Sequence, residues 1–263
     1  MRGSAPTASG AGMRPVAPHG PRMRGARLLA TAALAALALT GCAGLDGATS
    51  ASEPPLPLLT DTIDEAGADP TPAAQASLAE TALEVLDGIP VADRTEWDGY
   101  FDRAGSFGEG WADLDGDGCN TRQETLADDL DEVRFHRDGC RVDRGVLDDP
   151  YSGERVEFTR GQGTSELVQI DHVVALYNAW RTGAQELGFD ERVELANDPL
   201  NLQATVGWVN DDKGSQDASQ WLPPNEAYHC TYVARQIAVK ASYGLWVTPA
   251  EDDAMREVLA TCQ

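Results

Sequence analysis

The spacing of hydrophobic and polar residues predicts five helices along the chain. Helical spacing of apolar residues occurs in four segments, which are Leu78–Leu86, Thr121–Val133, Val173–Leu187 and Asn225–Ser242. Gly188 and Gly244 follow the last two segments and are typical of helix ends. A fifth helix is expected after Thr248, because Thr248-Pro249-Ala250-Glu251 combines a capping box with proline in the first turn.

Between these helices, from Val133 to Ile170, the pattern is typical of short strands. Apolar runs such as Val156–Phe158 and Leu167–Ile170 are separated by turn residues, at Asp149–Gly153 and again at Gly161–Gly163. We expect two or three antiparallel strands here. Together with the helices, they predict an α+β fold.

The first part of the chain has the pattern of an export signal. Arg24 and Arg27 precede the apolar stretch Leu28–Thr40, which ends in Leu39-Thr40-Gly41-Cys42. This ending resembles a bacterial lipobox. The resemblance implies that residues 1–41 are a lipoprotein signal peptide and that Cys42 is lipidated. The chain would then be anchored to the outer face of the cytoplasmic membrane, or be secreted, with no transmembrane helix in its mature part.

After the leader, residues 42–76 are rich in Ala, Gly, Ser, Thr, Pro and Asp, with three closely spaced prolines at positions 54, 55 and 57. Such a segment can bury little apolar surface, so we expect a disordered tether. The folded domain is expected to span residues 77–263, which is enough for one core.

The cysteine count agrees with an oxidising compartment. Lipidation of Cys42 would leave four cysteines, an even number. Three pairings are possible, and proximity in sequence favours Cys119 with Cys140 and Cys230 with Cys262. A zinc site is disfavoured because the chain has no Cys-x-x-Cys pair.

The charge of the chain opposes nucleic-acid binding over most of the surface. The formal net charge is −23, and removal of the five arginines of the leader would lower it to about −28. A surface of this sign repels phosphate backbones, so binding to nucleic acid would require a local basic or metal-binding cleft.

Acid, imidazole and amide side chains follow one another in an order that suits metal-assisted hydrolysis. Asp171 and His172 are adjacent where a predicted strand gives way to a helix, and Asn201 and Asn210 follow downstream. Histidine titrates near neutrality and can take a proton from water. Carboxylate and amide oxygens, as in Asp171 and Asn210, are the ligands that a hard cation such as Mg²⁺ prefers, with Mn²⁺ as an alternative.

This order resembles the ββα-metal motif of HNH nucleases, and further segments resemble the exported DUF1524-type branch of that family. They are Gly110–Asp113, Gly118–Arg122, Asp149–Tyr151, Asp171–Leu176, Asn197–Leu202 and Trp221–Pro223. The resemblance implies a ββα-metal core surrounded by helices, with His172 as general base. It implies that Asp171 and Asn210 hold the metal, and that Asn201 holds the motif's loop and orients His172.

One position departs from the family pattern. Such sequences often carry arginine directly after the second asparagine, whereas Asp211 and Asp212 follow Asn210 here. Lys213, Arg122 and Arg160 are the candidate substrate contacts, with ordinary ion pairs or a solvated charge as the alternative.

A separate acidic loop matches the EF-hand pattern for calcium. Aspartates stand at positions one, three and five, glycine at six and glutamate at twelve, with Cys119 at position seven; the acidic residues are Asp113, Asp115, Asp117 and Glu124. The alternative is a tight turn that anchors a disulfide.

Two functions follow from these observations. The first is a metal-dependent endonuclease, expected to be a monomer, that hydrolyses extracellular DNA or RNA. The second is a calcium-stabilised, non-catalytic surface binding protein with an HNH-like fold. The intact set of Asp171, His172 and Asn210 favours the first, and the strong negative charge favours the second.

Overall fold

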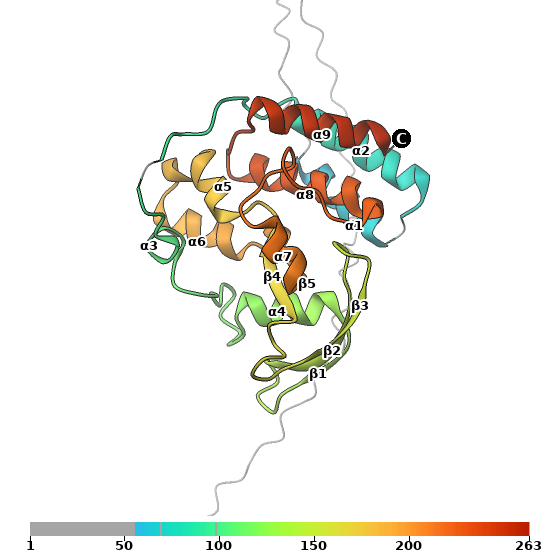
Figure 1. Cartoon of the computed structure of the whole chain (residues 1–263), viewed down its shortest axis with the longest axis vertical. Coiled ribbons are helices and arrows are strands. Elements are labelled where there is room, and N and C mark those ends of the chain that lie inside the picture. Colours follow the sequence, from blue (N-terminus) through green and yellow to red (C-terminus); the bar gives the residue numbers. More distant parts are fainter. Residues whose placement is uncertain (1–55, 69, 98, 263) are drawn as a thin grey trace, which may run out of the picture. The chain divides into compact units, whose positions relative to one another are not determined.

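The computed structural model describes residues 56–68, 70–97 and 99–262 (Figure 1). The predicted signal peptide and the lipidation site Cys42 lie outside these residues. The helices are α1 (Leu56–Ala68), α2 (Pro72–Leu86), α3 (Arg103–Phe107), α4 (Thr121–Asp129), α5 (Leu176–Arg181), α6 (Phe189–Asn197), α7 (Gly207–Lys213), α8 (His229–Ser242) and α9 (Pro249–Thr261). Short 3₁₀ turns occur at Ala184–Glu186, Pro199–Asn201 and Glu226–Tyr228.

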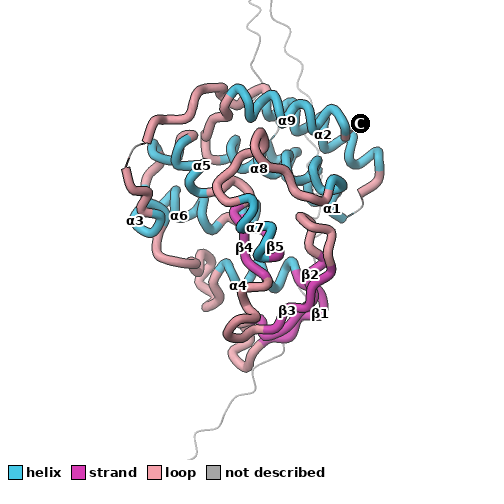
Figure 2. Tube along the Cα trace, viewed as in Figure 1, coloured by secondary structure: helices cyan, strands magenta, loops and turns pink. Residues whose placement is uncertain are grey.

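Within the part of the chain that the structure describes, five strands form two antiparallel sheets, which Figure 2 shows in magenta. The first sheet has the order β1-β2-β3 and comprises Leu130–Phe135, Val142–Asp148 and Arg155–Thr159. The second sheet pairs β4 (Val168–His172) with β5 (Leu202–Val206). Helices α4 and α7 both contact the β4–β5 pair. The predicted α+β fold is therefore confirmed, with a two-stranded sheet followed by a helix at its centre.

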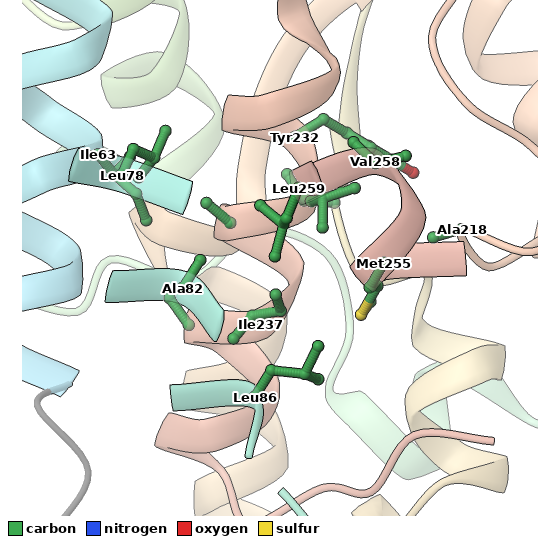
Figure 3. Packing of buried hydrophobic residues seen from close by; sticks show 14 of the residues in the cluster. Ile63, Leu78, Ala82, Leu86, Ala218, Tyr232, Ile237, Met255, Val258 and Leu259 are labelled. Atoms are coloured by element: carbon green, nitrogen blue, oxygen red, sulfur yellow. The ribbon is translucent and has the colours of Figure 1, made fainter. Parts of the chain in front are cut away.

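The largest hydrophobic core lies among α1, α2, α8 and α9. Leu78, Ala82 and Leu86 follow one face of α2 at intervals of four residues and are buried against α8, where Ile237 lies (Figure 3). Met255 and Leu259 of α9 join the same cluster. This spacing places the apolar side chains on one helical face, which explains why α2 and α8 pack together.

The prediction of a disordered tether up to residue 76 is wrong for the part that the structure describes. Leu56–Ala68 forms α1, whose Leu59, Ile63 and Ala66 are buried in the main core. Thr71 caps α2, and its hydroxyl accepts a hydrogen bond from the Ala74 N–H at 3.3 Å. The apolar residues of this stretch are few, but they lie on one narrow face of the helix and are buried. The folded part therefore begins before residue 77.

Two predicted helices are shorter than their hydrophobic pattern suggested. The helix that begins at Thr121 ends at Asp129, because Leu130 pairs with Leu147 and starts β1. The helix predicted from Val173 begins only at Leu176 and stops at Arg181. The hydrophobic pattern did not predict the next helix, α6. Gly188 lies directly before it, and the Gly188 N–H donates to the Glu191 carboxylate at 2.8 Å.

Both favoured disulfides are confirmed. Cys119 pairs with Cys140, with Cα atoms 5.5 Å apart, and joins the start of α4 to the turn between β1 and β2. Cys230 pairs with Cys262, with Cα atoms 6.0 Å apart, and joins α8 to the end of α9. The capping box at Thr248 is also confirmed, since its hydroxyl accepts from the Glu251 N–H at 3.2 Å.

Candidate active site

The β4–β5 pair and α7 bring the acid, the imidazole and an amide to one place. Asp171 and His172 are the last two residues of β4, where Asp171 lies opposite Gln203 and His172 opposite Leu202 of β5. Helix α7 follows β5 directly and carries Asn210 in its middle. Residues 30 or more positions apart in the sequence are thus joined by one strand pairing.

These side chains line a cavity with a volume of about 230 Å³. Its lining comprises Phe101, Arg103, Ile170, Asp171, His172, Ala175, Leu176, Tyr177, Asn210, Gly214 and Ser215. The structure therefore places Asp171, His172 and Asn210 around one cavity.

His172 is held by a stacking contact and a hydrogen bond. Its ring lies parallel to the Trp111 ring at a centroid distance of 5.6 Å and an interplanar angle of 5°. Its Nε2 lies 2.9 Å from the Ala196 carbonyl oxygen. A carbonyl oxygen can only accept, so Nε2 carries the proton and Nδ1 of the neutral ring is the basic nitrogen.

The surroundings of His172 keep the ring neutral. Burial, and after it the positive charge of Arg103, lowers the pKa of His172 to about 3, against the hydrogen bond to Ala196. This differs from the near-neutral titration expected for an exposed histidine. The neutral form is the one that can accept a proton, whereas negative charge arriving in the cavity would raise the pKa.

Asp171 is buried and bound from two sides. Its Oδ1 accepts from Lys213 Nζ at 2.9 Å, and its Oδ2 accepts from the Tyr151 hydroxyl at 2.8 Å. Burial raises the pKa of Asp171, whereas the Lys213 charge and both hydrogen bonds oppose that rise. With its ammonium partner at contact distance, we assign the carboxylate as charged.

Asn210 lines the cavity and is held through its amide nitrogen. Its Nδ2 donates to Gln169 Oε1 at 2.7 Å, so the other end of the amide is the one left for water or a ligand. Gln169 lies on β4, two residues before Asp171. The strand that carries the acid therefore also orients the amide.

Asn201 ties together the two segments that hold His172. Its Oδ1 accepts from the Val174 N–H at 2.8 Å, and its Nδ2 donates to the Leu195 carbonyl at 3.1 Å. Its own carbonyl accepts from the Val173 N–H at 2.8 Å. Val173 follows His172 and Leu195 precedes Ala196, so Asn201 is placed to set the distance between the ring and its carbonyl partner.

The three predicted substrate contacts lie elsewhere or are engaged within the protein. Lys213 is fully buried and also donates to the His172 carbonyl at 2.8 Å. Arg160 donates to the Val142 carbonyl at 2.7 Å and to Gln123 Oε1 at 2.5 Å. Arg122 is close enough to Arg160 that the latter's charge lowers its pKa, after burial as the larger cause. Neither arginine is among the residues that line the cavity.

Sequence reasoning missed four residues that shape the site: Arg103, Trp111, Tyr151 and Gln169. Trp111 and Tyr151 stand in segments already singled out by the family resemblance, Gly110–Asp113 and Asp149–Tyr151, so a signal for them was present. Arg103 and Gln169 carried no such signal.

The acidic loop brings three of its carboxylates together. One oxygen from each of Asp113, Asp115 and Asp117 lies within 4.8 Å of the others, all on exposed side chains. Negative charge from these aspartates contributes, after burial, to raising the pKa of Glu124. The loop is also closed by hydrogen bonds to Asp113, from the Gly116 N–H at 2.8 Å and the Gly118 N–H at 3.0 Å. Calcium binding there stays a prediction.

The donor set at the cavity fits an oxygen-coordinated divalent cation. A carboxylate offers about four lone-pair positions, and the two hydrogen bonds to Asp171 use two of them. The Asn210 amide oxygen supplies a second ligand type, and His172 is not needed as one. The Lys213 ammonium beside Asp171 reduces the net negative charge that these residues offer to a cation.

None of the described helices combines the length and the apolar character needed to cross a membrane.

Comparison with known proteins identifies a family and a relative of this chain. The family model described as "GmrSD restriction endonucleases, C-terminal domain" matches residues 120–258. An "Uncharacterized secreted protein" of Arthroderma benhamiae is 38% identical over 187 residues, which cover 70% of this chain and 86% of the relative. No solved structure matches the chain. Because the family model spans more than half of the chain and includes the strand pair, Asp171, His172, Asn201 and Asn210, the chain belongs to the family of the C-terminal domain of GmrSD restriction endonucleases.

Proposed function

We propose that the protein is a metal-dependent endonuclease of the HNH type that hydrolyses phosphodiester bonds. The observation that carries the proposal is the cavity onto which Asp171, His172 and Asn210 converge from β4 and α7. Membership of a restriction-endonuclease family supports it independently.

In this proposal His172 acts as the general base. Its Nε2–H stays bound to the Ala196 carbonyl, and Nδ1 takes a proton from a water molecule in the cavity. The water oxygen forms a bond to phosphorus, the bond between phosphorus and one ester oxygen breaks, and that oxygen leaves as an alcohol after taking a proton from solvent. A negative phosphate that enters the cavity would raise the pKa of His172, against the lowering by burial and by Arg103.

Asp171 and Asn210 would hold the divalent cation, Mg²⁺ or Mn²⁺. When bound, the cation supplies charge stabilisation for the phosphate and its leaving oxygen. Tyr151 and Gln169 keep the two ligand side chains in place by their hydrogen bonds. Asn201 is a positioning residue in this scheme, because its bonds reach the neighbours of His172 and of Ala196 and not the cavity itself.

We further propose that the enzyme acts outside the cytoplasm on extracellular DNA or RNA, anchored through Cys42 or released. Two disulfides and a relative whose name includes "secreted" support export. The lipid anchor rests on the sequence pattern at Leu39–Cys42.

The test is cleavage of supercoiled plasmid DNA and of single-stranded RNA by the purified protein with Mg²⁺, Mn²⁺ or EDTA. We expect nicking that requires a divalent cation and that falls at least 100-fold in His172→Ala, as is typical for loss of a general base. His229→Ala is the matched control, since His229 is bound to the Pro223 carbonyl and is absent from the cavity lining.

Equal cleavage by the parent and His172→Ala would assign the activity to a contaminant and remove the proposal. Binding of nucleic acid without cleavage by the parent, under every metal condition, would instead favour a non-catalytic binding protein stabilised by calcium.

A further inference from the structure

Part of the cavity lining comes from residues that precede the segment matched by the family. Phe101 and Arg103 stand before residue 120, at the start of α3, and α3 contacts α5 and α6 (Figure 1). Tyr177, on α5, lines the same cavity. These three side chains face the cavity shared with Asp171, His172 and Asn210, yet the proposed chemistry uses none of them.

Several arginines of this acidic chain are paired with carboxylates, and Arg103 is not one of them. Arg94, Arg141, Arg155 and Arg256 each form an ion pair with an aspartate. Among the described residues, Arg103 has no ion-pair partner, although its side chain is exposed and its charge acts on His172. A cation without an acidic partner at the rim of a cavity is a ready site for a phosphate, because guanidinium and phosphate form paired hydrogen bonds.

The aromatic side chains that line the cavity also contact an aromatic side chain outside it. The rings of Phe101 and Tyr177 lie 5.2 Å apart at 57°, and Phe101 also contacts Trp180 at 6.0 Å. Arg181 lies over the Tyr177 ring at 6.0 Å. Phe101, Tyr177 and Trp180 are each only partly buried, so some ring surface faces solvent beside the arginines.

We propose that Arg103, Phe101 and Tyr177 form a nucleotide subsite that binds an unpaired base and its phosphate, which makes single-stranded nucleic acid the preferred substrate. The proposal rests on the nuclease function proposed above and names its substrate class. Arg103 pairs with a phosphate oxygen, and the adjoining base lies against the Tyr177 and Phe101 rings.

The physical reason for the single strand is the access of ring surface to a base. In a duplex both faces of each base are stacked, so an aromatic side chain reaches a base face only after the base leaves the stack, at a cost of a few kcal/mol. A cavity of about 230 Å³ has room for a group the size of one base. Aromatic rings combined with arginine are also the usual means of binding single strands without strong sequence preference.

Binding is measured apart from cleavage, by fluorescence anisotropy of a labelled 12-nucleotide single strand and of the matching duplex, with the whole protein in EDTA. We expect the parent to bind the single strand at least five-fold more tightly. We expect Tyr177→Ala to weaken single-strand binding about five-fold or more, the low end of base stacking, and Tyr177→Phe to keep it.

Arg103→Ala should weaken binding of the single strand at least ten-fold, with Arg103→Lys between it and the parent. Arg137→Ala is the matched control, because Arg137 is exposed in the β1–β2 turn and absent from the cavity lining. Melting curves for each variant establish that loss of binding is not loss of folding, and only variants that melt like the parent are compared.

Equal affinity of the parent for single strand and duplex would overturn the proposal, as would equal losses in Arg103→Ala and Arg137→Ala. Because this assay needs no turnover, its outcome is separate from that of the nuclease proposal. Tight, Arg103-dependent binding of the single strand without any cleavage would refute the nuclease proposal and support the nucleotide subsite. Cleavage that depends on His172 but shows no preference for single strands would support the nuclease proposal and refute the subsite.

Discussion

The ammonium of Lys213 lies 2.9 Å from the Asp171 carboxylate, and both side chains are buried. The same ammonium donates to the His172 carbonyl, so the last residue of α7 is fastened to the end of β4. This contact explains how a seven-residue helix keeps Asn210 at the cavity. Lys213 is therefore placed to position the site and to keep Asp171 charged.

Replacing Lys213 by methionine should lower the free energy of unfolding by about 3–5 kcal/mol, because it leaves an uncompensated carboxylate in the interior. Urea denaturation measures the loss. Lys240→Met is the matched control: Lys240 forms an equally buried pair with Glu251, at 2.8 Å, between α8 and α9. Both variants should lose stability, but only Lys213→Met should lower cleavage by protein that is still folded. Similar cleavage by both variants would show that Lys213 has no role beyond stability.

Asp129 predicts a pH dependence of stability. Burial raises its pKa from 3.8 to about 6, against hydrogen bonding from the Ala204 N–H and the charge of Arg235. Because the carboxyl of Asp129 binds its proton more tightly in the folded state than in the unfolded state, protonation of Asp129 contributes to the free energy of unfolding. This contribution is complete below about pH 4. It is lost as the pH rises through about 6.

Asp129→Asn should therefore gain stability relative to the parent between pH 4 and pH 8, by up to about 3 kcal/mol. Urea denaturation of both proteins across this range measures the difference, in which the other titrating groups cancel. The asparagine can still accept the hydrogen bonds that Ala204 and Gln203 donate to Asp129. A difference that stays constant with pH would refute the raised pKa.

The acidic loop predicts stabilisation by calcium. The three clustered aspartates would bind Ca²⁺ in the folded state only, so free Ca²⁺ at a hundred times its Kd would add about 2.7 kcal/mol. Thermal melting with Ca²⁺, with Mg²⁺ and with EDTA measures this. Asp113→Ala should lose the response, and Asp253→Ala, which changes an exposed aspartate of α9, should retain it. An unchanged melting temperature of the parent in Ca²⁺ would leave the tight-turn interpretation.

The disulfide between α8 and α9 should contribute about 2–5 kcal/mol of stability. The double variant Cys230→Ser and Cys262→Ser tests this without leaving a free thiol, with guanidinium denaturation as the measurement. The corresponding change at Cys119 and Cys140 should cost a similar amount, because the sequence separations of 32 and 21 residues give similar loop entropies. Identical midpoints for the parent and either double variant would contradict this account.

Predictions from the sequence succeeded where short-range rules apply. The capping box at Thr248 involves residues three apart, and it is present with both hydrogen bonds. The predictions failed where a strand competes with a helix. The hydrophobic pattern is helical through Val133, yet Leu130 pairs with Leu147 and begins a strand. They also failed at α1, where Leu59 and Ile63 find their partners on distant helices.

For the candidate site, the sequence by itself determined which chemical groups are present and that Asp171 and His172 are neighbours. Only the tertiary structure decided that Asn210 reaches the same cavity, that Trp111 stacks on His172 and that Arg103 faces it. It also decided that Lys213 is buried against Asp171 and not free for substrate. The physical reason is that these contacts join elements whose relative positions depend on strand pairing and core packing over many residues, which no local pattern encodes.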